Sequence, residues 1–459
     1  MRIGMRTNRS AAISVGVAFT AIIGAALATP AAAVDPEPAR KPLVSVEYFP
    51  DPGGEGRRTE VPVNTETVSG RPAARSLAPA AGTTDGEVGQ LSVTGPSADR
   101  LDVVIVGDGY TADQQDAFHT AAATKWAAIT DIEPYSSYQG LMNVWTVDAV
   151  SVESGITGDP TADVAKDTAL GSYFWCSQTE RLICADIDKV ASYAAKAPEA
   201  DLVIVVSNST KYGGAGYSGL EAEGYPFDGV STLSSDNAQS SMIAAHEIAH
   251  SVGLLADEYT YDSYGTWTGG ELPDINSSVF TAEQMAANRT KWYRWLGETD
   301  PTGGTVGTYE GSSYYPFGIY RPTANSLMRA LNISDFNLPG REAMIAGFYR
   351  EANALSSEVG TDSAILRTSR IKVSRAELTG LAAPELRWYV DGFPVKRAQG
   401  LSSVAPAALG VPADGRTHTV TVTSVDRTAS VRDPEVRAEA TEKLTWTVKA
   451  SGRKGHKRH

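Results

Sequence analysis

The sequence of 459 residues is poor in histidine, cysteine and positive charge. It has six histidines and two cysteines, and 54 Asp and Glu residues against 40 Lys and Arg residues give a formal net charge of −14. Contact with phosphate backbones needs clustered Lys and Arg, so we expect no nucleic-acid partner. A zinc site made of thiolates alone needs four cysteines and is excluded by the count.

Long apolar runs are also scarce, and the first 33 residues hold the only one. Basic residues precede an apolar stretch (11–28), and three alanines (31–33) form a small-residue cleavage site. This pattern is typical of a secretory signal peptide. No other stretch approaches the roughly 20 apolar residues of a membrane-spanning helix. We therefore expect a secreted, extracellular protein without stable membrane association.

The two cysteines lie close together in YFWCSQTERLIC, at Cys176 and Cys184. In an exported protein, two neighbouring cysteines are more often paired than free. We predict a structural disulfide bond between them.

Changes in composition divide the rest of the chain. Residues 34–98 are interpreted as an N-terminal accessory segment or propeptide, with a strand at 43–49 and a final part of linker composition. Residues 99–355 form an α/β region. Residues 356–450 contain short alternating strands that indicate a β-sandwich accessory domain, and 451–459 form a basic, disordered tail.

Strands and helices alternate in the α/β region. Strands are predicted at 101–106, 142–150, 201–208 and 229–233, and helices at 111–129, 186–197 and 240–253. The continuous apolar runs of these strands indicate burial on both faces. A capping box at Thr111 and Gln114 predicts where the first helix begins.

The predicted helix 240–253 carries the motif HEIAH, with His246, Glu247 and His250. Positions i and i+4 lie on one face of a helix, so both histidines can reach a single metal ion. Glu247 lies one residue further round, where it can take a proton from water without ligating the metal. Two histidines and a glutamate buried without a metal would leave polar groups unsatisfied. The motif therefore predicts a catalytic Zn²⁺ site of the HExxH type.

The third ligand is less clear from the sequence. Two of the other four histidines lie in the tail, His418 lies in the predicted sandwich, and His119 lies in an amphipathic helix. A carboxylate is thus the better candidate. Gly253 is expected to turn the chain back in a left-handed conformation, and it is followed by Asp257 and Glu258.

The order His, Gly, ligand is the metzincin arrangement HExxHxxGxxH, in which some families have aspartate in the last position. Here that position is Ala256, and the carboxylate comes one residue later. This leaves Asp257 and Glu258 in competition. We favour Asp257 because its short side chain suits a turn directly below the metal, with Glu258 orienting a histidine ring. Met328, in RPTANSLMRAL, suits a methionine turn beneath the metal.

Four stretches together resemble the IgA-peptidase family of secreted zinc metallopeptidases: HEIAHSVGLLADEY (246–259), DRLDVVIVGDGYTADQ (99–114), KWYRW (291–295) and GIYRPTANSLMR (318–329). The resemblance covers about residues 99–355. The family name refers to immunoglobulin A, and that substrate is not carried over to this chain.

The resemblance implies that His246, His250 and Asp257 are zinc ligands, that Glu247 is the catalytic base, and that Met328 forms the methionine turn. It also implies a metzincin-like α/β (α+β) domain, with a mixed twisted sheet and an active-site helix behind a cleft. Residues 201–208 and 211–219 are candidates for the upper rim of that cleft, where a peptide adds as a strand.

The function expected is that of a secreted zinc metalloendopeptidase, a hydrolase of extracellular proteins or peptides. A zinc-activated water attacks the peptide bond, and Glu247 is the general base. Tyr259 and Tyr320 are candidates for stabilising the oxyanion. A thermolysin-like enzyme with Glu271 as third ligand is an alternative. A second alternative is a cell-wall or glycan-binding protein with a structural zinc site.

Overall fold

The computed structural model describes residues 43–63 and 85–450. The predicted signal peptide and the predicted basic tail lie outside these residues. Within the described part, no helix is long and apolar enough to cross a membrane.

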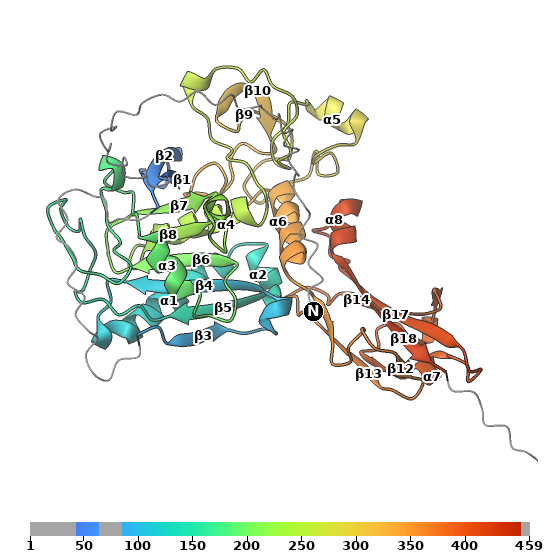
Figure 1. Ribbon diagram of the computed structural model, residues 1–459. Helices are drawn as coiled ribbons and strands as arrows, with labels where there is room; N and C mark the ends of the chain where they lie inside the picture. The colour runs from blue at the N-terminus through green and yellow to red at the C-terminus, as the bar shows by residue number, and fades with distance from the viewer. Residues whose placement is uncertain (1–42, 64–84, 451–459) are drawn as a thin grey trace, which may run out of the picture.

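An eight-stranded mixed sheet forms the larger part of the molecule (Figure 1), with the order β2-β1-β7-β8-β6-β4-β5-β3. The strands are β1 (Leu43–Tyr48), β2 (Arg57–Pro62), β3 (Val88–Ser92), β4 (Leu101–Asp108), β5 (Met142–Val147), β6 (Leu202–Ser207), β7 (Gly214–Ser218) and β8 (Val230–Ser234). The four strands β5, β4, β6 and β8 run parallel, and the outer strands join them antiparallel. The expected mixed α/β fold is thus present.

Helices cover both faces of this sheet. They are α1 (Gln115–Thr130), α2 (Tyr135–Tyr138), α3 (Ile187–Ala194), α4 (Ser241–Ser251) and α6 (Leu338–Glu351). A further helix, α5 (Ala282–Asn288), contributes Met285 to a separate apolar cluster with Trp292 and Trp295. The capping box at Thr111 and Gln114 is present, although a short 3-10 turn precedes α1. Asp186 caps α3 by accepting a hydrogen bond from the backbone of Lys189.

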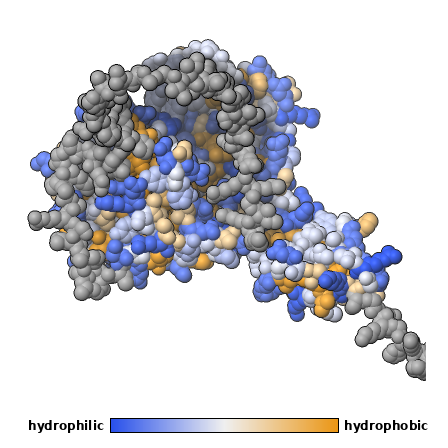
Figure 2. All heavy atoms as spheres, in the orientation of Figure 1, coloured by the Kyte–Doolittle hydropathy of each residue, from blue (hydrophilic) through white to orange (hydrophobic). Residues whose placement is uncertain are grey.

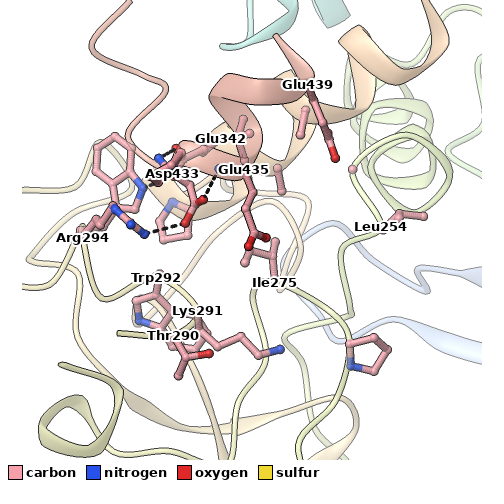
Figure 3. A pocket seen from close by; sticks show the side chains of 18 of the residues that line it. Leu254, Ile275, Thr290, Lys291, Trp292, Arg294, Glu342, Asp433, Glu435 and Glu439 are labelled. Atoms are coloured by element: carbon pink, nitrogen blue, oxygen red, sulfur yellow. Dashed lines mark hydrogen bonds and ion pairs between the residues drawn. The ribbon is translucent and has the colours of Figure 1, made fainter. Parts of the chain in front are cut away.

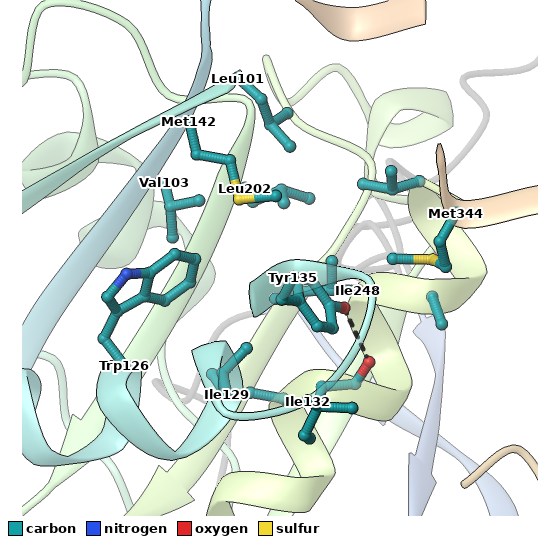
Figure 4. Packing of buried hydrophobic residues seen from close by; sticks show 14 of the residues in the cluster. Leu101, Val103, Trp126, Ile129, Ile132, Tyr135, Met142, Leu202, Ile248 and Met344 are labelled. Carbon is teal, nitrogen blue, oxygen red and sulfur yellow. Dashed lines mark hydrogen bonds between the residues drawn. The ribbon is translucent and has the colours of Figure 1, made fainter. Parts of the chain in front are cut away.

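The position of β4 between two helical layers explains why its apolar run is continuous. Val103 and Ile105 point into the cluster of buried residues that α1 and α4 contribute to (Figure 4). Val104 and Val106 point the other way, into the cluster that includes Ile187 of α3. Each such side chain stabilises the fold by about 1.5–3 kcal/mol. The strand is therefore apolar throughout, as a strand between two helical layers must be.

The segment before residue 99 contributes three strands to this sheet. β3 pairs with β5 at one edge, although its residues lie in a stretch of linker composition. At the other edge β1 pairs with β7, and β2 pairs with β1. This hairpin, β1–β2, spans residues 43–62. The N-terminal segment is interpreted from the sequence as an accessory segment or propeptide, and its described parts extend the sheet at both edges.

Two smaller sheets follow in the C-terminal part. β12 (Ile365–Leu366), β14 (Glu385–Val390), β15 (Phe393–Pro394), β17 (Thr417–Val425) and β18 (Thr441–Lys449) form one, and β11 (Leu355–Ser357), β13 (Ile371–Arg375) and β16 (Ser403–Val404) form the other. Both contribute to one apolar cluster, in which Trp388 stacks on Trp446 at 6.1 Å between ring centroids. The short helices α7 (Pro406–Leu409) and α8 (Pro434–Glu439) complete this part. The sandwich arrangement and the domain boundaries stay predictions.

A two-stranded sheet, β9 (Tyr309–Ser312) and β10 (Tyr315–Arg321), lies beyond the main sheet on the side of β1 and β2 (Figure 1). The predicted disulfide bond between Cys176 and Cys184 is confirmed. Figure 2 shows hydrophilic residues spread over the visible face, with hydrophobic residues gathered in smaller patches between them.

Candidate metal centre

Helix α4 presents the two histidines of the HExxH motif on one face. The Nδ1 of His246 lies 2.9 Å from the Leu327 carbonyl oxygen, and the Nδ1 of His250 lies 2.7 Å from the Leu255 carbonyl oxygen. A carbonyl only accepts hydrogen bonds, so each Nδ1 is the donor. This leaves both Nε2 atoms as lone-pair donors, and they lie 3.0 Å apart. Histidines that bind metals are held in this way.

Asp257 completes a group of three. Its Oδ1 lies 3.1 Å from Nε2 of His246 and 3.2 Å from Nε2 of His250. Its Oδ2 accepts a hydrogen bond of 2.6 Å from the hydroxyl of Tyr314. The carboxylate is thus oriented by one oxygen while the other faces both imidazoles.

Glu258 faces away from the histidines. Its carboxylate accepts hydrogen bonds from Ser326, Asn276 and Asn337, at 2.6, 3.0 and 2.9 Å. Its backbone N–H donates to the Met328 carbonyl. The expectation that Glu258 orients a histidine ring is therefore wrong. It ties the loop after α4 to the loop around Met328 instead, because those polar groups offer it more donors than the histidines do.

The turn after α4 differs from the one expected. The left-handed residue is Leu254, with φ of 51°, and not Gly253. Gly253 is required for another reason. A Cβ there would lie 2.6 Å from Sδ of Met344 and 2.8 Å from the carbonyl oxygen of Ala249. The glycine thus allows the close approach of α6.

The other candidate metal ligands, His119, His418 and Glu271, have partners outside this group. His119 contacts Asp148, and His418 contacts Asp391 and Asp414. Glu271 pairs with Lys291 at 3.2 Å and accepts a backbone hydrogen bond from Val279, which argues against the thermolysin-like alternative.

The two tyrosine candidates are also accounted for. Tyr320 lies in β10, where its backbone exchanges hydrogen bonds with Ser278. Tyr259 is fully buried beside Phe49. The tyrosine that contacts the metal group is Tyr314, which the sequence did not indicate.

A fourth donor comes from the hairpin. Oε1 of Glu47 in β1 lies 3.2 Å from Nε2 of His246, and Oε2 lies 3.7 Å from Nε2 of His250. Glu47, His246, His250 and Asp257 form a group able to hold a metal ion. The strand predicted at 43–49 did not reveal this, since nothing in its sequence marks Glu47 as close to a motif about 200 residues later in the chain.

The group fits a divalent cation. In a tetrahedral site with ligands about 2.0–2.1 Å from zinc, neighbouring ligand atoms are about 3.3 Å apart, and the distances above lie between 3.0 and 3.7 Å. Both oxygens of Glu47 are buried without a hydrogen-bond donor. A buried carboxylate in that state is costly unless a cation balances it.

The electrostatics of the group follow from burial and from its opposite charges. Burial lowers the pKa of His246, but the carboxylates of Asp257 and Glu47 outweigh it and raise that pKa to about 10. Burial and the neighbouring Glu47 raise the pKa of Glu247 to about 8. Burial raises the pKa of Asp257, but His250 and His246 outweigh it and hold that pKa well below the usual range. Metal binding must therefore displace protons from the imidazoles.

Glu247 lies between α4 and β7. A Cβ at Gly216 would collide with the Glu247 carboxyl group, so glycine in β7 allows this packing. Glu247, His250 and Asp257 line a cavity of about 330 Å³, together with Ser218 and Tyr314. The catalytic-base candidate thus shares a cavity with the metal group.

A second cavity, of about 580 Å³, lies between α6, α8 and the KWYRW segment (Figure 3). An ion pair of 2.6 Å between Arg294 and Asp433 crosses it, and Glu435 and Glu439 project from α8. Leu272 lines both cavities. Residues of the C-terminal part and residues that follow α4 therefore line the same cavity.

The model of the family described as IgA Peptidase M64 matches residues 90–304 and 298–348. The chain belongs to this family. All four stretches that carried the resemblance lie within the matched residues, so that prediction is confirmed. Among curated proteins, none is significantly similar in sequence.

Membership in this peptidase family assigns the chain to the hydrolases that act on proteins or peptides. It also suggests a metal, for which the four-residue group is available. Neither the identity of the metal nor the roles of single residues follow from the match.

Proposed function

We propose that the protein is a secreted, zinc-dependent endopeptidase that hydrolyses peptide bonds in extracellular proteins. The convergence of two histidine Nε2 atoms and Oδ1 of Asp257 beside Glu247 is the observation that carries this proposal. Two imidazoles and one carboxylate are a common ligand set for catalytic zinc. Secretion is supported by the N-terminal sequence pattern and by the disulfide bond.

His246, His250 and Asp257 would hold the ion. When bound, zinc supplies Lewis-acid chemistry, which lowers the pKa of water and polarises a carbonyl group. Tyr314 fixes the Asp257 carboxylate through its hydrogen bond, and the backbone carbonyls of Leu327 and Leu255 fix the imidazoles.

Glu247 is the general base. In its ionised form the carboxylate accepts a proton from the attacking water, and the protonated carboxyl group then donates that proton to the leaving amine. Its place against Gly216 keeps the carboxylate within the cavity that the substrate enters. Attack by water and departure of the amine complete the hydrolysis.

We assign the catalytic domain to 99–355 and a metzincin-like arrangement to it. Met328 is buried, its carbonyl accepts the backbone hydrogen bond of Glu258, and the neighbouring Leu327 contacts His246. This supports a methionine turn. β7 packs against the motif helix, and we place the upper rim there, although β1 pairs with its outer edge in this structure. β6 lies inside the sheet, so residues 201–208 are not an edge.

The alternative of a structural zinc site in a wall- or glycan-binding protein has one observation in its favour. Glu47 supplies a fourth protein donor, and structural zinc sites have four. That reading leaves Glu247 without a role and does not account for membership in a peptidase family. The peptidase is therefore the better supported function.

The test is digestion of an unfolded protein by zinc-loaded residues 34–459, beside Glu247→Gln, with product masses measured. The parent is expected to produce cleavage that Glu247→Gln does not. Equal digestion by both would contradict the proposal. The proposal would also be contradicted if the substrate stayed intact both with the parent and with a Glu47→Ala variant of the parent.

A further inference from the structure

The hairpin β1–β2 lies on the sheet edge next to the metal group. β1 runs antiparallel to β7, with Glu47 opposite Gly216, Val46 opposite Tyr217 and Ser45 opposite Ser218. Without this hairpin, β7 would be the edge strand. An extended peptide that binds by strand addition uses the same N–H and C=O groups of an edge strand. The hairpin therefore takes the place such a peptide needs.

Alternation along β1 places its side chains on two sides. Val44 and Val46 are buried in the apolar cluster shared with α3. Glu47 and Phe49 point to the other side, since side chains two residues apart share a face of a strand. The Phe49 ring meets His246 edge-on, at 5.0 Å between ring centroids. The strand thus covers the imidazole as well as the sheet edge.

The Glu47 carboxylate faces the fourth ligand position, which His246, His250 and Asp257 leave open. It is 2% exposed, and neither oxygen accepts a hydrogen bond. The histidine Nε2 atoms lie 3.2 and 3.7 Å from its oxygens, and these are the atoms that face the metal position. A catalytic zinc site has three protein ligands and keeps its fourth position for water and substrate. Glu47 closes that position.

Contacts on both sides hold the hairpin in place. Arg58 donates to the hydroxyls of Tyr314, at 2.6 Å, and Ser218, at 3.2 Å. Tyr261 donates to the carbonyl of Gly56 at 2.8 Å. The backbone N–H groups of Ile187 and Asn332 donate to carbonyls of the hairpin and the residue after it. These polar bonds act together with the burial of Val44, Val46, Val61 and Phe49, so withdrawal of the hairpin also exposes those apolar side chains.

We propose that the β1–β2 hairpin is an intramolecular inhibitor that keeps the peptidase latent. It occupies the substrate's strand position on β7, and Glu47 is the fourth ligand of the metal. Withdrawal of the hairpin frees the strand edge and the fourth position together. This inference rests on the proposed function and assigns its regulation.

The test uses residues 34–459 loaded with cobalt(II), whose visible spectrum reports ligand changes, and acetohydroxamate as the probe for an open position. Glu47→Ala removes the fourth ligand. Glu47→Gln keeps the size of the side chain and removes its charge, in case the alanine variant does not fold. Glu60→Ala, an exposed glutamate of β2, is the matched control.

The expected result is that acetohydroxamate binds both Glu47 variants at least tenfold more tightly than it binds the parent or Glu60→Ala. Loss of the Glu47 contacts with His246 and His250 also weakens the hold of the hairpin on β7, so digestion of an unfolded protein is expected to rise at least tenfold in the same two variants. Equal hydroxamate binding by parent and Glu47 variants would overturn the inference.

The outcomes also separate this inference from the proposed function. A parent that already digests protein as fast as Glu47→Ala, with activity lost in Glu247→Gln, refutes latency and leaves the peptidase standing. Selective hydroxamate binding by the Glu47 variants without any proteolysis refutes the peptidase and leaves closure by Glu47 standing.

Discussion

Tyr314 and Asp257 are joined by a hydrogen bond of 2.6 Å, and the Asp257 oxygen that does not take part in it faces both histidines. The two residues come from segments far apart in the sequence. Tyr314 has φ of 74°, which a non-glycine residue adopts rarely. Strain of this kind collects where function requires a side chain in one place. The relationship makes Tyr314 a positioning residue for the metal group.

Tyr314→Phe is therefore expected to weaken zinc binding by about 10- to 100-fold, as loss of a partner behind a metal ligand does. Competition with a chromophoric chelator measures the affinity. Tyr309→Phe is the matched control, because its hydroxyl bonds only to the carbonyl of Thr305 in the described contacts. Equal affinities in the two variants would refute the role of Tyr314.

The choice of third ligand makes a second prediction. Asp257→Ala is expected to bind zinc more weakly than the parent, because removal of Oδ1 leaves only His246, His250 and Glu47 as donors. Glu271→Ala is expected to keep the zinc affinity of the parent, since that carboxylate pairs with Lys291. Metal content after dialysis distinguishes them. Full zinc in Asp257→Ala together with loss of zinc in Glu271→Ala would restore the thermolysin-like alternative.

Glu258 is predicted to matter for stability. Glu258→Ala removes three buried hydrogen bonds, from Asn276, Asn337 and Ser326, and leaves Ser326 without its acceptor; each lost bond costs about 1–3 kcal/mol. The free energy of unfolding is expected to fall by about 3 kcal/mol or more. Denaturant unfolding measures it, and a change below about 1 kcal/mol would contradict the account.

Lys125 of α1 gives a prediction about pH. Its Nζ donates to the carbonyl of Asn237, just before α4, and burial lowers its pKa to about 8. The charged form is thus disfavoured in the folded state. That destabilisation is complete below pH 8 and is relieved as the pH rises from about 8 towards the unfolded value of about 10.4.

Unfolding free energies of the parent and Lys125→Met, measured between pH 7 and 10, test this. The parent is expected to gain up to about 3 kcal/mol relative to the variant over that range. The difference between the two chains is the relevant quantity, because it cancels other titrating groups. A constant difference would show that Lys125 keeps an ordinary pKa.

The sequence predicted the parts of the fold and site that depend on local pattern. The apolar run of β4 and the capping box at Thr111 are local signals, and so is the spacing of His246 and His250. The choice between Asp257 and Glu258 was a preference only. It depends on where Asn276 and Asn337 place their amide groups, which is a tertiary property.

Glu47 and Tyr314 were out of reach for the same reason. Each reaches the metal group through strand pairing or a turn that brings distant segments together, and neither carries a motif. β7 illustrates a further limit. Its glycines are poor strand formers, yet the strand forms because glycine alone admits the Glu247 carboxyl group beside Gly216. In β7, packing therefore outweighs the low strand propensity of glycine.

The most direct test of the central claim compares two zinc-loaded chains in which the metal position is open: Glu47→Ala, and Glu47→Ala combined with Glu247→Gln. The measurement is the rate of cleavage of an unfolded protein. The account predicts a rate about 10²- to 10⁴-fold lower in the double variant, the usual contribution of a general base. Equal rates in the two chains would contradict it, because cleavage would then not depend on Glu247.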